Sequence, residues 1–389
     1  MTTRPVAPPA PSPTSRPASR PASRPASRPA APTVPLTVSP GTAPVVATPR
    51  PAPAISVPHQ TGEARALAGP GRDVLPAHPQ RCTYLGPEGT FTEAALGTLP
   101  EAATHEVFPS DSVAGALDAV RGGEAAAALV PIENSVEGAV TATLDELATG
   151  RPLTIRREVL LPISFALLVR PGTTLDDVKS VTGHPVTQAQ VRRWLARHLP
   201  HAEWESAASN GEGARLVRDG RFDCAFAGEF AARRYGLEAL ITEINDAPDA
   251  MTRFVLLGRP GRVAAPTGMD KTSIVVWPAA DEPGALLALL AEWAVRGVNL
   301  LRIESRPTGE GLGRYSFSID AEGHVTDRPV REALTGLHRI SSRIRFLGSY
   351  ARADRTAPAT DPRLANHEFA RSAAWVARCI DGIGELPEL

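Results

Sequence analysis

The chain has 389 residues, of which 42% are hydrophobic, and its 41 basic and 42 acidic side chains leave a formal net charge of -1. This length can bury more than one core, and the near-neutral charge argues against a nucleic acid or an anionic membrane as partner. The three cysteines form no CxxC pair or histidine cluster, and no apolar run approaches the roughly 20 residues that cross a bilayer. We therefore expect two or three folded units of a cytoplasmic protein with a small-molecule partner.

The first segment, residues 1–79, is rich in Pro, Ala, Ser and Arg, and repeats an Arg-Pro-Ala-Ser unit between Arg16 and Ala30. Because it has few large apolar side chains to offset the entropy of ordering, this composition predicts a disordered, extended tail. Its Arg and Ser content leaves an organelle transit peptide as an alternative. The density of proline disfavours that alternative, because transit peptides form amphipathic helices.

From Arg81 onward, short apolar runs alternate with helix signals, which is the rhythm of an α/β fold. A strand at 82–85 precedes Thr90 and Glu93, whose spacing is that of a capping box opening a helix to about Leu99. Next come a strand at 106–108, a helix capped by Ser110 with apolar residues at 113, 117 and 120, a strand at 126–130, a loop at 131–135, a helix ending near Gly150, and one long or two shorter strands within 154–169.

A second set of elements follows the first. It comprises a strand near Val181, a helix at 187–198, a helix after Ser209, a strand at 224–227, a helix closed by Gly236, and a returning strand at 252–257. Two sets of βα units with a returning strand predict two lobes separated by a cleft.

Residues 258–268, which contain two prolines, predict a linker. Beyond it the expected order is strand 272–276, helix 283–296, strands 299–305 and 314–321, helix 330–340 and strand 344–350. This order is the ferredoxin-like βαββαβ arrangement. The glycines at 309, 311 and 313 fall between two strands, so they favour a hairpin loop over dinucleotide binding. A last helix is predicted at 363–380.

Four motifs in the first α/β part carry a family resemblance. They are Gly86–Phe91 (GPEGTF), Pro131–Gly138 (PIENSVEG), His184–Pro185 followed by Gln190, and Thr252–Phe254 (TRF). In this order and spacing they resemble the signature motifs of prephenate dehydratases. In the second part, Gly284–Leu286 and Glu304–Pro307 (ESRP) resemble the phenylalanine-binding motifs of the ACT domain attached to these enzymes.

The resemblance implies a domain organisation. We expect a two-lobed, periplasmic-binding-protein-like catalytic domain at 80–260 and a ferredoxin-like ACT regulatory domain at 270–353. The tail at 1–79 precedes them, and a C-terminal extension at 354–389 follows. The resemblance further implies prephenate as substrate, L-phenylalanine as effector, a homodimer or homotetramer, and no cofactor or metal.

The chemistry of the implied reaction agrees with the motifs. Prephenate is a dianion that loses carbon dioxide and a ring hydroxyl, so the site must bind two carboxylates and help a poor leaving group depart. Family precedent makes Thr252 the first choice for the hydroxyl that contacts the departing oxygen. Because a threonine hydroxyl is a very weak acid, we expect it to act as a hydrogen-bond donor and not to protonate that oxygen alone. The other expected catalytic residues position and stabilise polar groups: Ser135, Asn134, Glu133 and Gln190.

Substrate binding is expected from a second group of residues. Helix N-termini beside Thr90, Ser135 and Ser209 would offer backbone donors to carboxylates, and Arg253 a bidentate contact. The expected substrate-binding residues are Thr90, Arg253, His184, Phe254, Ser209 and Asn210. Taken singly, each has a bland explanation as a helix cap, loop polar group, strand residue or structural histidine. Their joint occurrence favours a site.

Three positions depart from the common family pattern. Gly183 stands where many relatives have Ser, Ala250 replaces a frequent Asn, and Asn210-Gly211 replaces a common Thr-Ala pair. These departures affect the list of substrate contacts and leave Thr252 in place.

The effector site is expected where a helix begins beside a strand end, because such a helix start can receive an amino-acid carboxylate. Its expected residues are Gly284, Ala285, Leu286, Asn299, Glu304, Ser305, Arg306 and Pro307, some completing the pocket or a dimer interface.

Two other functions remain open at this stage. An arogenate dehydratase would differ in substrate by an amino group in place of the keto oxygen, which sequence inspection does not decide. A non-catalytic amino-acid sensor is disfavoured by the intact Thr252, Arg253 and Ser135. A fused chorismate mutase is disfavoured because the N-terminal region lacks long helical periodicity.

Overall fold

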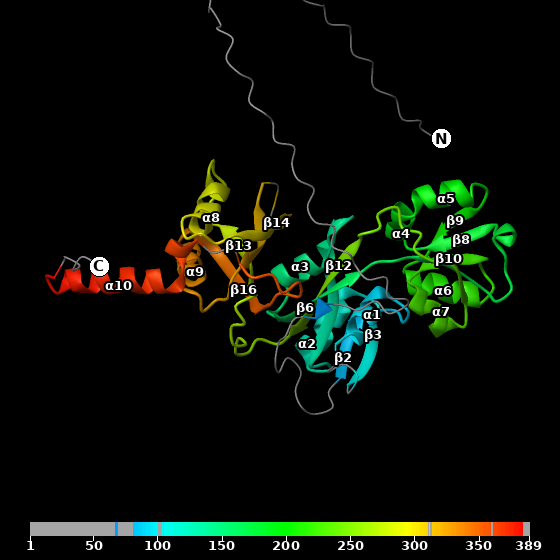
Figure 1. The fold of residues 1–389 in the computed structure, drawn as a ribbon, viewed down its shortest axis with the longest axis horizontal. Helices are drawn as coiled ribbons and strands as arrows, with labels where there is room; N and C mark the ends of the chain where they lie inside the picture. Colours follow the sequence, from blue (N-terminus) through cyan, green and yellow to red (C-terminus); the bar gives the residue numbers. More distant parts are fainter. Residues whose placement is uncertain are drawn as a thin grey trace, which may run out of the picture. The chain divides into compact units, whose positions relative to one another are not determined.

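The computed structural model describes residues 67–68, 81–99, 103, 105–309, 311, 313–358 and 361–383. Within these residues the strands form three β-sheets with helices packed on them (Figure 1). The predicted α/β class is confirmed. None of the helices in the described ranges combines the length and apolarity required to span a lipid bilayer.

The first sheet has the strand order β1-β6-β12-β4-β2-β3, with β5 paired to β4. Its strands are β1 (Leu67–Ala68), β2 (Arg81–Leu85), β3 (Glu106–Ser110), β4 (Ala127–Asn134), β5 (Gly138–Ala139), β6 (Thr154–Pro162) and β12 (Met251–Gly258). Its helices are α1 (Phe91–Gly97), α2 (Val113–Gly122) and α3 (Thr141–Thr149). The returning strand β12 inserts antiparallel between β4 and β6, so residues far apart in sequence share the centre of this sheet.

The second sheet has the order β11-β7-β10-β8-β9. Its strands are β7 (Ala166–Val169), β8 (Ser180–Gly183), β9 (Glu203–Ser206), β10 (Cys224–Ala227) and β11 (Glu238–Ile241). Its helices are η2 (Leu175–Asp177), α4 (Pro185–Gln190), α5 (Arg192–His198), α6 (Asn210–Arg218) and α7 (Glu229–Tyr235). One cluster of buried apolar side chains runs from Tyr84 in the first sheet through Phe165 to Phe226 in the second.

The third sheet is antiparallel, with the order β14-β15-β13-β16. In chain order its elements are β13 (Asp270–Pro278), α8 (Ala285–Ala294), β14 (Leu300–Pro307), β15 (Tyr315–Glu322), α9 (Arg328–Ile340) and β16 (Ser341–Ala351), which is the predicted βαββαβ. Leu289 and Trp293 of α8 and Leu337 of α9 pack on one face of this sheet. Beyond it lie η3 (Pro362–Leu364) and α10 (Asn366–Ile380), near the predicted last helix.

The other face of the third sheet packs on the first sheet. Val275 and Leu347 share a buried cluster with Ile155 and Leu144. At Gly348 a Cβ would collide with the carbonyl of Ile155, so glycine lets β16 approach β6 closely.

Local structure corrects several predicted boundaries. Ser112, not Ser110, caps α2, because Ser112 is extended and its Oγ accepts from the Gly115 amide at 3.0 Å, whereas Ser110 ends β3. The predicted 131–135 loop is largely strand, since β4 continues to Asn134. A register shift in β12 between Arg253 and Phe254 accompanies Pro131, which has no amide to donate.

Other differences concern short elements. The predicted helix at 187–198 is broken near Val191 into α4 and α5. The strands β9 and β11 were not expected, because short edge segments such as Glu203–Ser206 lack an apolar run. Within the predicted tail, Leu67–Ala68 form β1, which pairs with β6. The rest of the predicted disordered tail lies outside the described residues.

Candidate active site

A cavity of about 520 Å³ lies between the first and second sheets. Its lining comes from ends of the strands β2, β4 and β12, from His184 just after β8, and from the starts of α1, α4 and α6. Of the predicted catalytic and substrate-binding residues, eight line this cavity: Thr90, Asn134, His184, Gln190, Ser209, Asn210, Thr252 and Phe254. The motifs that are separated in sequence therefore meet at one pocket.

The centre of the pocket is a pair of side chains on adjacent strands, Thr252 of β12 and Asn134 of β4. The two residues are opposite each other in the strand ladder, and Asn134 Nδ2 donates to Thr252 Oγ1 at 2.8 Å. Asn134 Oδ1 accepts from the amides of Val136 and Glu137, which holds the amide in this orientation. Because Thr252 Oγ1 acts as acceptor in this bond, its own proton is left to donate to a ligand.

The second-sheet part of the chain contributes residues at the starts of α4 and α6. Asn210 Oδ1 accepts from the His184 amide at 3.0 Å and from Thr187 Oγ1 at 2.8 Å. Ser209 caps α6 by accepting from the Glu212 amide at 3.0 Å. These bonds fix the loop ends and leave the Asn210 Nδ2 donors for a ligand.

His184 is held as a neutral donor. Its ring Nδ1 accepts from the Val186 amide at 3.3 Å, which places the proton of the neutral ring on Nε2. Burial lowers the pKa of His184 below its ordinary value, with an opposing effect of Glu137. A neutral imidazole can donate a hydrogen bond in this pocket without a formal charge.

Gln190 is the most deeply buried amide in the pocket lining, with an exposed fraction of 3%. Its Oε1 has no hydrogen-bond partner within the described part of the chain. A buried acceptor without a partner is costly, so this position favours a ligand with a hydroxyl group to donate.

Thr90 is the N-cap of α1, as the capping prediction expected. Its Oγ1 accepts from the Glu93 amide at 3.4 Å, and the Glu93 carboxylate accepts from the Gly89 amide rather than from Thr90. Thr90 Oγ1 also donates to the Leu85 carbonyl at 3.3 Å. The hydroxyl of Thr90 is thus occupied, and what it brings to the pocket is a fixed start of α1.

Contacts outside the pocket lining join the loop after β2 to α7 of the second-sheet part. Tyr235 Oη donates to the Glu88 carbonyl at 2.7 Å, and Arg234 forms an ion pair with the Glu88 side chain. At Gly211 a Cβ would collide with the Glu88 carbonyl. The Asn210-Gly211 departure from the family pattern therefore has a steric reason in this chain.

Three predicted residues lie outside the pocket. Arg253 is buried on the opposite face of β12, and its guanidinium donates to Glu158 at 2.7 Å and to Asp320 at 2.6 Å. This placement corrects the expected bidentate contact of Arg253 with substrate, because successive strand residues face opposite ways and the donors are already used. Glu133 lies on the same face as Arg253, and its Oε2 is 3.3 Å from Arg253 Nη1.

Ser135 is the third of these residues. It lies in a turn between β4 and β5, not at a helix N-terminus, since α3 begins at Thr141. Its Oγ accepts from the Met251 amide at 2.9 Å, and its own amide donates to the Met251 carbonyl. This corrects the expected carboxylate site beside Ser135. Its two hydrogen bonds instead hold the β4–β5 turn against Met251, the residue before Thr252.

The pocket also contains residues that sequence inspection missed. Thr187 and Arg215 line it, together with the acidic Asp111 and Glu212. Arg215 is half-exposed and contacts Glu212 at 3.3 Å and Asp219 at 3.5 Å. The signal available in the sequence was that Arg215 is the sixth residue of the helix that Ser209 caps.

A second cavity, of about 800 Å³, lies in the third-sheet part of the chain. Of the predicted effector residues, Gly284, Ala285 and Leu286 line it, beside the aromatic side chains Trp277, Tyr315 and Phe317. Gly284 precedes α8 with a φ of 92°, a left-handed conformation that glycine adopts without strain.

The remaining effector residues do not line this cavity within one chain: Asn299, Glu304, Ser305, Arg306 and Pro307. Arg306 is held instead by Asp145 of α3, with its Nε and Nη2 donating to the two carboxylate oxygens at 2.9 Å and 2.8 Å. A direct effector contact by Arg306 would have to compete with this bidentate pair.

The family model described as prephenate dehydratase matches residues 82–262. The prephenate dehydratase of Mycolicibacterium vanbaalenii is 48% identical over 312 residues, covering 77% of this chain and 98% of the relative.

Two solved structures are also similar. A prephenate dehydratase from Arthrobacter aurescens, solved in complex with L-Phe, has 51% identity and a TM-score of 0.73, and the match covers 77% of this chain and 99% of that one. A structure described as a novel type of quorum-quenching acylase has 29% identity and a TM-score of 0.63, and the match covers 71% of this chain and all (100%) of that one.

Proposed function

The chain belongs to the prephenate dehydratase family, and we propose that the pocket around Thr252 and Asn134 is where it performs this reaction. The enzyme is a lyase of phenylalanine biosynthesis that converts prephenate to phenylpyruvate, carbon dioxide and water. The observation that supports the assignment of the site most strongly is the Asn134–Thr252 hydrogen bond, which leaves the threonine proton directed to a ligand.

In the proposed reaction the bond between the ring carbon and the departing carboxylate breaks, and its electron pair flows into the ring as the ring becomes aromatic. The bond from the ring to its hydroxyl breaks at the same time. Thr252 donates a hydrogen bond to that oxygen, which stabilises the negative charge that develops on it. The proton that completes the leaving water molecule comes from the bulk solvent, which gives up one proton per turnover, because a threonine hydroxyl is too weak an acid to give its own proton away unaided.

The two carboxylates of prephenate are proposed to bind on the second-lobe side. The start of α6 presents backbone amides behind the Ser209 cap, and the neighbouring Asn210 has free amide donors. Arg215 adds a cation on the same helix. His184, as a neutral donor, and Gln190, as an acceptor without a partner, would bind the keto and hydroxyl oxygens.

The test of this proposal is turnover of prephenate and arogenate, measured side by side with the full-length protein. We expect prephenate to be the better substrate, because the neutral His184 ring offers a hydrogen-bond donor, which matches a keto oxygen better than an ammonium group. A preference for arogenate would replace the substrate assignment. No turnover of either compound would contradict the site.

We further propose that residues 80–260 form a two-lobed domain like periplasmic binding proteins, and that residues 270–353 form an ACT domain that binds L-phenylalanine. The second cavity combines a helix start at Gly284 with aromatic walls at Trp277 and Phe317, which suits an aromatic amino acid. The Arthrobacter relative is described with L-Phe bound. In a homodimer, the segment Glu304–Pro307 of the second copy is proposed to complete this cavity.

Calorimetric titration of the full-length protein with L-phenylalanine tests the effector site. Substituting Phe317→Ala should weaken binding of phenylalanine at least tenfold while prephenate turnover without effector stays within twofold. Equal binding to both proteins would place the effector elsewhere.

A further inference from the structure

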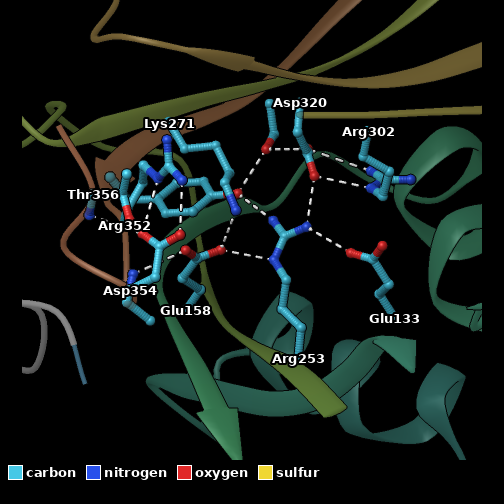
Figure 2. A network of polar contacts seen from close by, with 12 residues as sticks. Glu133, Glu158, Arg253, Lys271, Arg302, Asp320, Arg352, Asp354 and Thr356 are labelled. Carbon is cyan, nitrogen blue, oxygen red and sulfur yellow. Dashed lines mark hydrogen bonds and ion pairs between the residues drawn. The ribbon is translucent and has the colours of Figure 1, made fainter. Parts of the chain in front are cut away.

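A cluster of charged side chains is buried where the first sheet meets the third (Figure 2). We name it the charge cluster and define it as Arg253, Lys271 and Arg302 together with Glu133, Glu158 and Asp320. The side chains of Glu158 and Asp320 are 1% and 0% exposed, and that of Glu133 is 39% exposed. Three cations therefore face three carboxylates, two of which have almost no access to water.

Arg253 is the centre of the charge cluster. Its Nε donates to Glu158 of β6 at 2.7 Å, its Nη1 to Asp320 of β15 at 2.6 Å, and its Nη2 to the Tyr350 hydroxyl of β16 at 2.8 Å. One side chain from β12 thus binds its own sheet and two strands of the third sheet at once. Such a fork has little freedom to move while its partners stay in place.

The partners of Arg253 are themselves held within the third sheet. Asp320 accepts from Arg302 Nε at 2.8 Å and from Ser273 Oγ at 2.6 Å. Lys271 donates to Glu158 at 2.8 Å. A shift of β13, β14 or β15 would therefore change the contacts of Arg253.

The charge cluster lies directly behind the catalytic pair. In the β4–β12 ladder, Thr252 pairs with Asn134 and the next rung pairs Arg253 with Glu133. Because consecutive strand residues face opposite sides, the first rung faces the substrate pocket and the second faces the third sheet. Movement of Arg253 relative to its sheet would tilt the strand segment that presents Thr252.

The charge cluster also shares strands with the effector cavity. Phe317 of β15 lines that cavity, and Asp320 follows three residues later, about 10 Å along the strand at the usual rise per residue. On β13, Trp277 lines the cavity and Ser273 contacts Asp320. Two strands therefore run from the effector cavity into the charge cluster.

Part of the contact between the two sheets does not involve these charges. The adjoining part of the same contact is apolar, with Val275 and Leu347 packed against Ile155. Buried ion pairs are often no more stabilising than apolar residues of the same size, whereas they constrain geometry strongly. The distinctive effect of the charge cluster is therefore on the position of β12.

We propose that the charge cluster couples the effector cavity to the catalytic pair, with Arg253 as the positioning residue of Thr252. This inference rests on the proposed function of both cavities. An effector that binds one arrangement of the third sheet more tightly shifts Asp320 and Tyr350, which moves Arg253 and turns Thr252 and Asn134 away from their productive geometry.

The test compares two acidic residues on β15. Asp320→Asn keeps the shape of the side chain and removes the charge that binds Arg253. Glu322→Gln is the matched control, because Glu322 is also largely buried, 12% exposed, but accepts from Arg352 and does not contact Arg253. A second variant, Tyr350→Phe, removes a single acceptor of Arg253 without changing any charge, and it decides the result if Asp320→Asn does not fold.

For each full-length protein we would measure kcat and KM for prephenate with and without saturating L-phenylalanine, and the affinity for L-phenylalanine by titration. We expect Asp320→Asn to bind L-phenylalanine within threefold of the original affinity, to lose at least tenfold in kcat with KM changed less than threefold, and to respond to L-phenylalanine less than threefold. Tyr350→Phe should change in the same direction by a smaller factor, and Glu322→Gln should behave like the original protein.

Two outcomes would overturn the inference and are distinguishable. If the original protein responds to L-phenylalanine and both Asp320→Asn and Tyr350→Phe respond equally with unchanged kcat, the charge cluster is structural and the effector site stands. If the original protein turns over prephenate but neither binds nor responds to L-phenylalanine, the effector proposal fails together with the coupling, and the catalytic assignment stands.

Discussion

The substrate pocket and the charge cluster occupy opposite faces of the strands β4 and β12. They differ in whether their polar groups have hydrogen-bond partners within the protein. In the pocket, Gln190 Oε1 lacks a partner among the residues that the structure describes, and the Thr252 proton is free to donate. In the charge cluster, Glu158 accepts from Arg253, Lys271 and the Ala353 amide. The acceptor in the pocket awaits a donor from a ligand, whereas the buried carboxylates Glu158 and Asp320 already accept from donors of the protein, although Arg302 Nη1 has no partner in the described part of the chain.

This difference also explains why the Thr-Arg-Phe motif was misleading. Arginine beside a catalytic threonine suggests a carboxylate receptor, since a guanidinium binds carboxylates well. In the structure the carboxylates that Arg253 binds are those of Glu158 and Asp320. The following experiments test the contrast between the two faces.

The largest effect is expected from removing the central cation of the charge cluster. Arg253→Met should lower the free energy of unfolding by about 3–5 kcal/mol, because it leaves buried carboxylates with too few counter-charges. Urea denaturation followed by circular dichroism measures this. The matched control is Arg215→Met in the pocket, where the half-exposed arginine should matter for KM rather than for stability. Equal stability loss in both variants would contradict the contrast.

Removing the catalytic hydroxyl should affect turnover and leave the fold intact. Thr252→Ala is expected to reduce kcat by roughly 100- to 1000-fold, the scale of losing one preorganised donor. Steady-state kinetics with prephenate measures the loss, and Thr252→Ser, which keeps a hydroxyl, should recover most of it. Ser135→Ala should have a milder effect, because Ser135 fastens Met251. Normal turnover by a folded Thr252→Ala protein would remove this residue from the mechanism.

Acid should weaken the charge cluster before it affects the pocket geometry. Burial alone would raise the pKa of Asp320, but Arg253 and Arg302 outweigh it and hold the pKa well below its ordinary value of 3.8. The pKa of Glu158 is likewise lowered from 4.5, because Arg253 and Lys271 outweigh the opposing effect of burial.

For a carboxyl group with a lowered pKa in the folded state, the stabilisation is complete above the unfolded-state pKa and disappears as the pH falls toward the folded-state pKa. The free energy of unfolding should therefore decrease below about pH 4.5, by up to about 1.4 kcal/mol per pH unit for each group. Urea denaturation between pH 7 and about pH 3.5 measures the slope. A shallower slope in Asp320→Asn is expected, and an identical slope would show that other carboxyl groups control acid unfolding.

The smallest effect on stability is expected in the pocket. Gln190→Met should leave the free energy of unfolding unchanged or raise it by about 1 kcal/mol, since a buried acceptor without a partner is replaced by an apolar group of similar size. Turnover should nevertheless fall, by about tenfold in kcat/KM. Thermal unfolding and kinetics on the same preparation test both halves. A clear loss of stability would show that Gln190 has a structural partner.

Much of the local structure was predictable because its causes are local. Thr90 and Ser209 cap α1 and α6 as predicted, and Gly236 closes α7 with a φ of 66°, since caps depend on side chains within a few residues. The βαββαβ order was also predictable from alternating apolar runs and turn residues. The end of β4 was not, because Pro131 is tolerated in the strand through a bulge in β4 itself, where Ile132 has no opposite residue on the distant partner β12.

By itself, the sequence determined the family, the order of most elements and eight of the residues that line the pocket, because motif spacing and hydrophobic periodicity are properties of the chain. The tertiary structure alone decided which face each strand residue takes and which carboxylates lie within reach. Thr252 and Arg253 are adjacent in sequence, but their side chains point to opposite faces of the sheet. Thr252 lines the substrate pocket, whereas Arg253 binds Asp320, which is 67 residues away in the chain. The reason is physical: strand alternation sets the two directions, and the packing of a second sheet supplies the charges that make one of them a buried ion cluster.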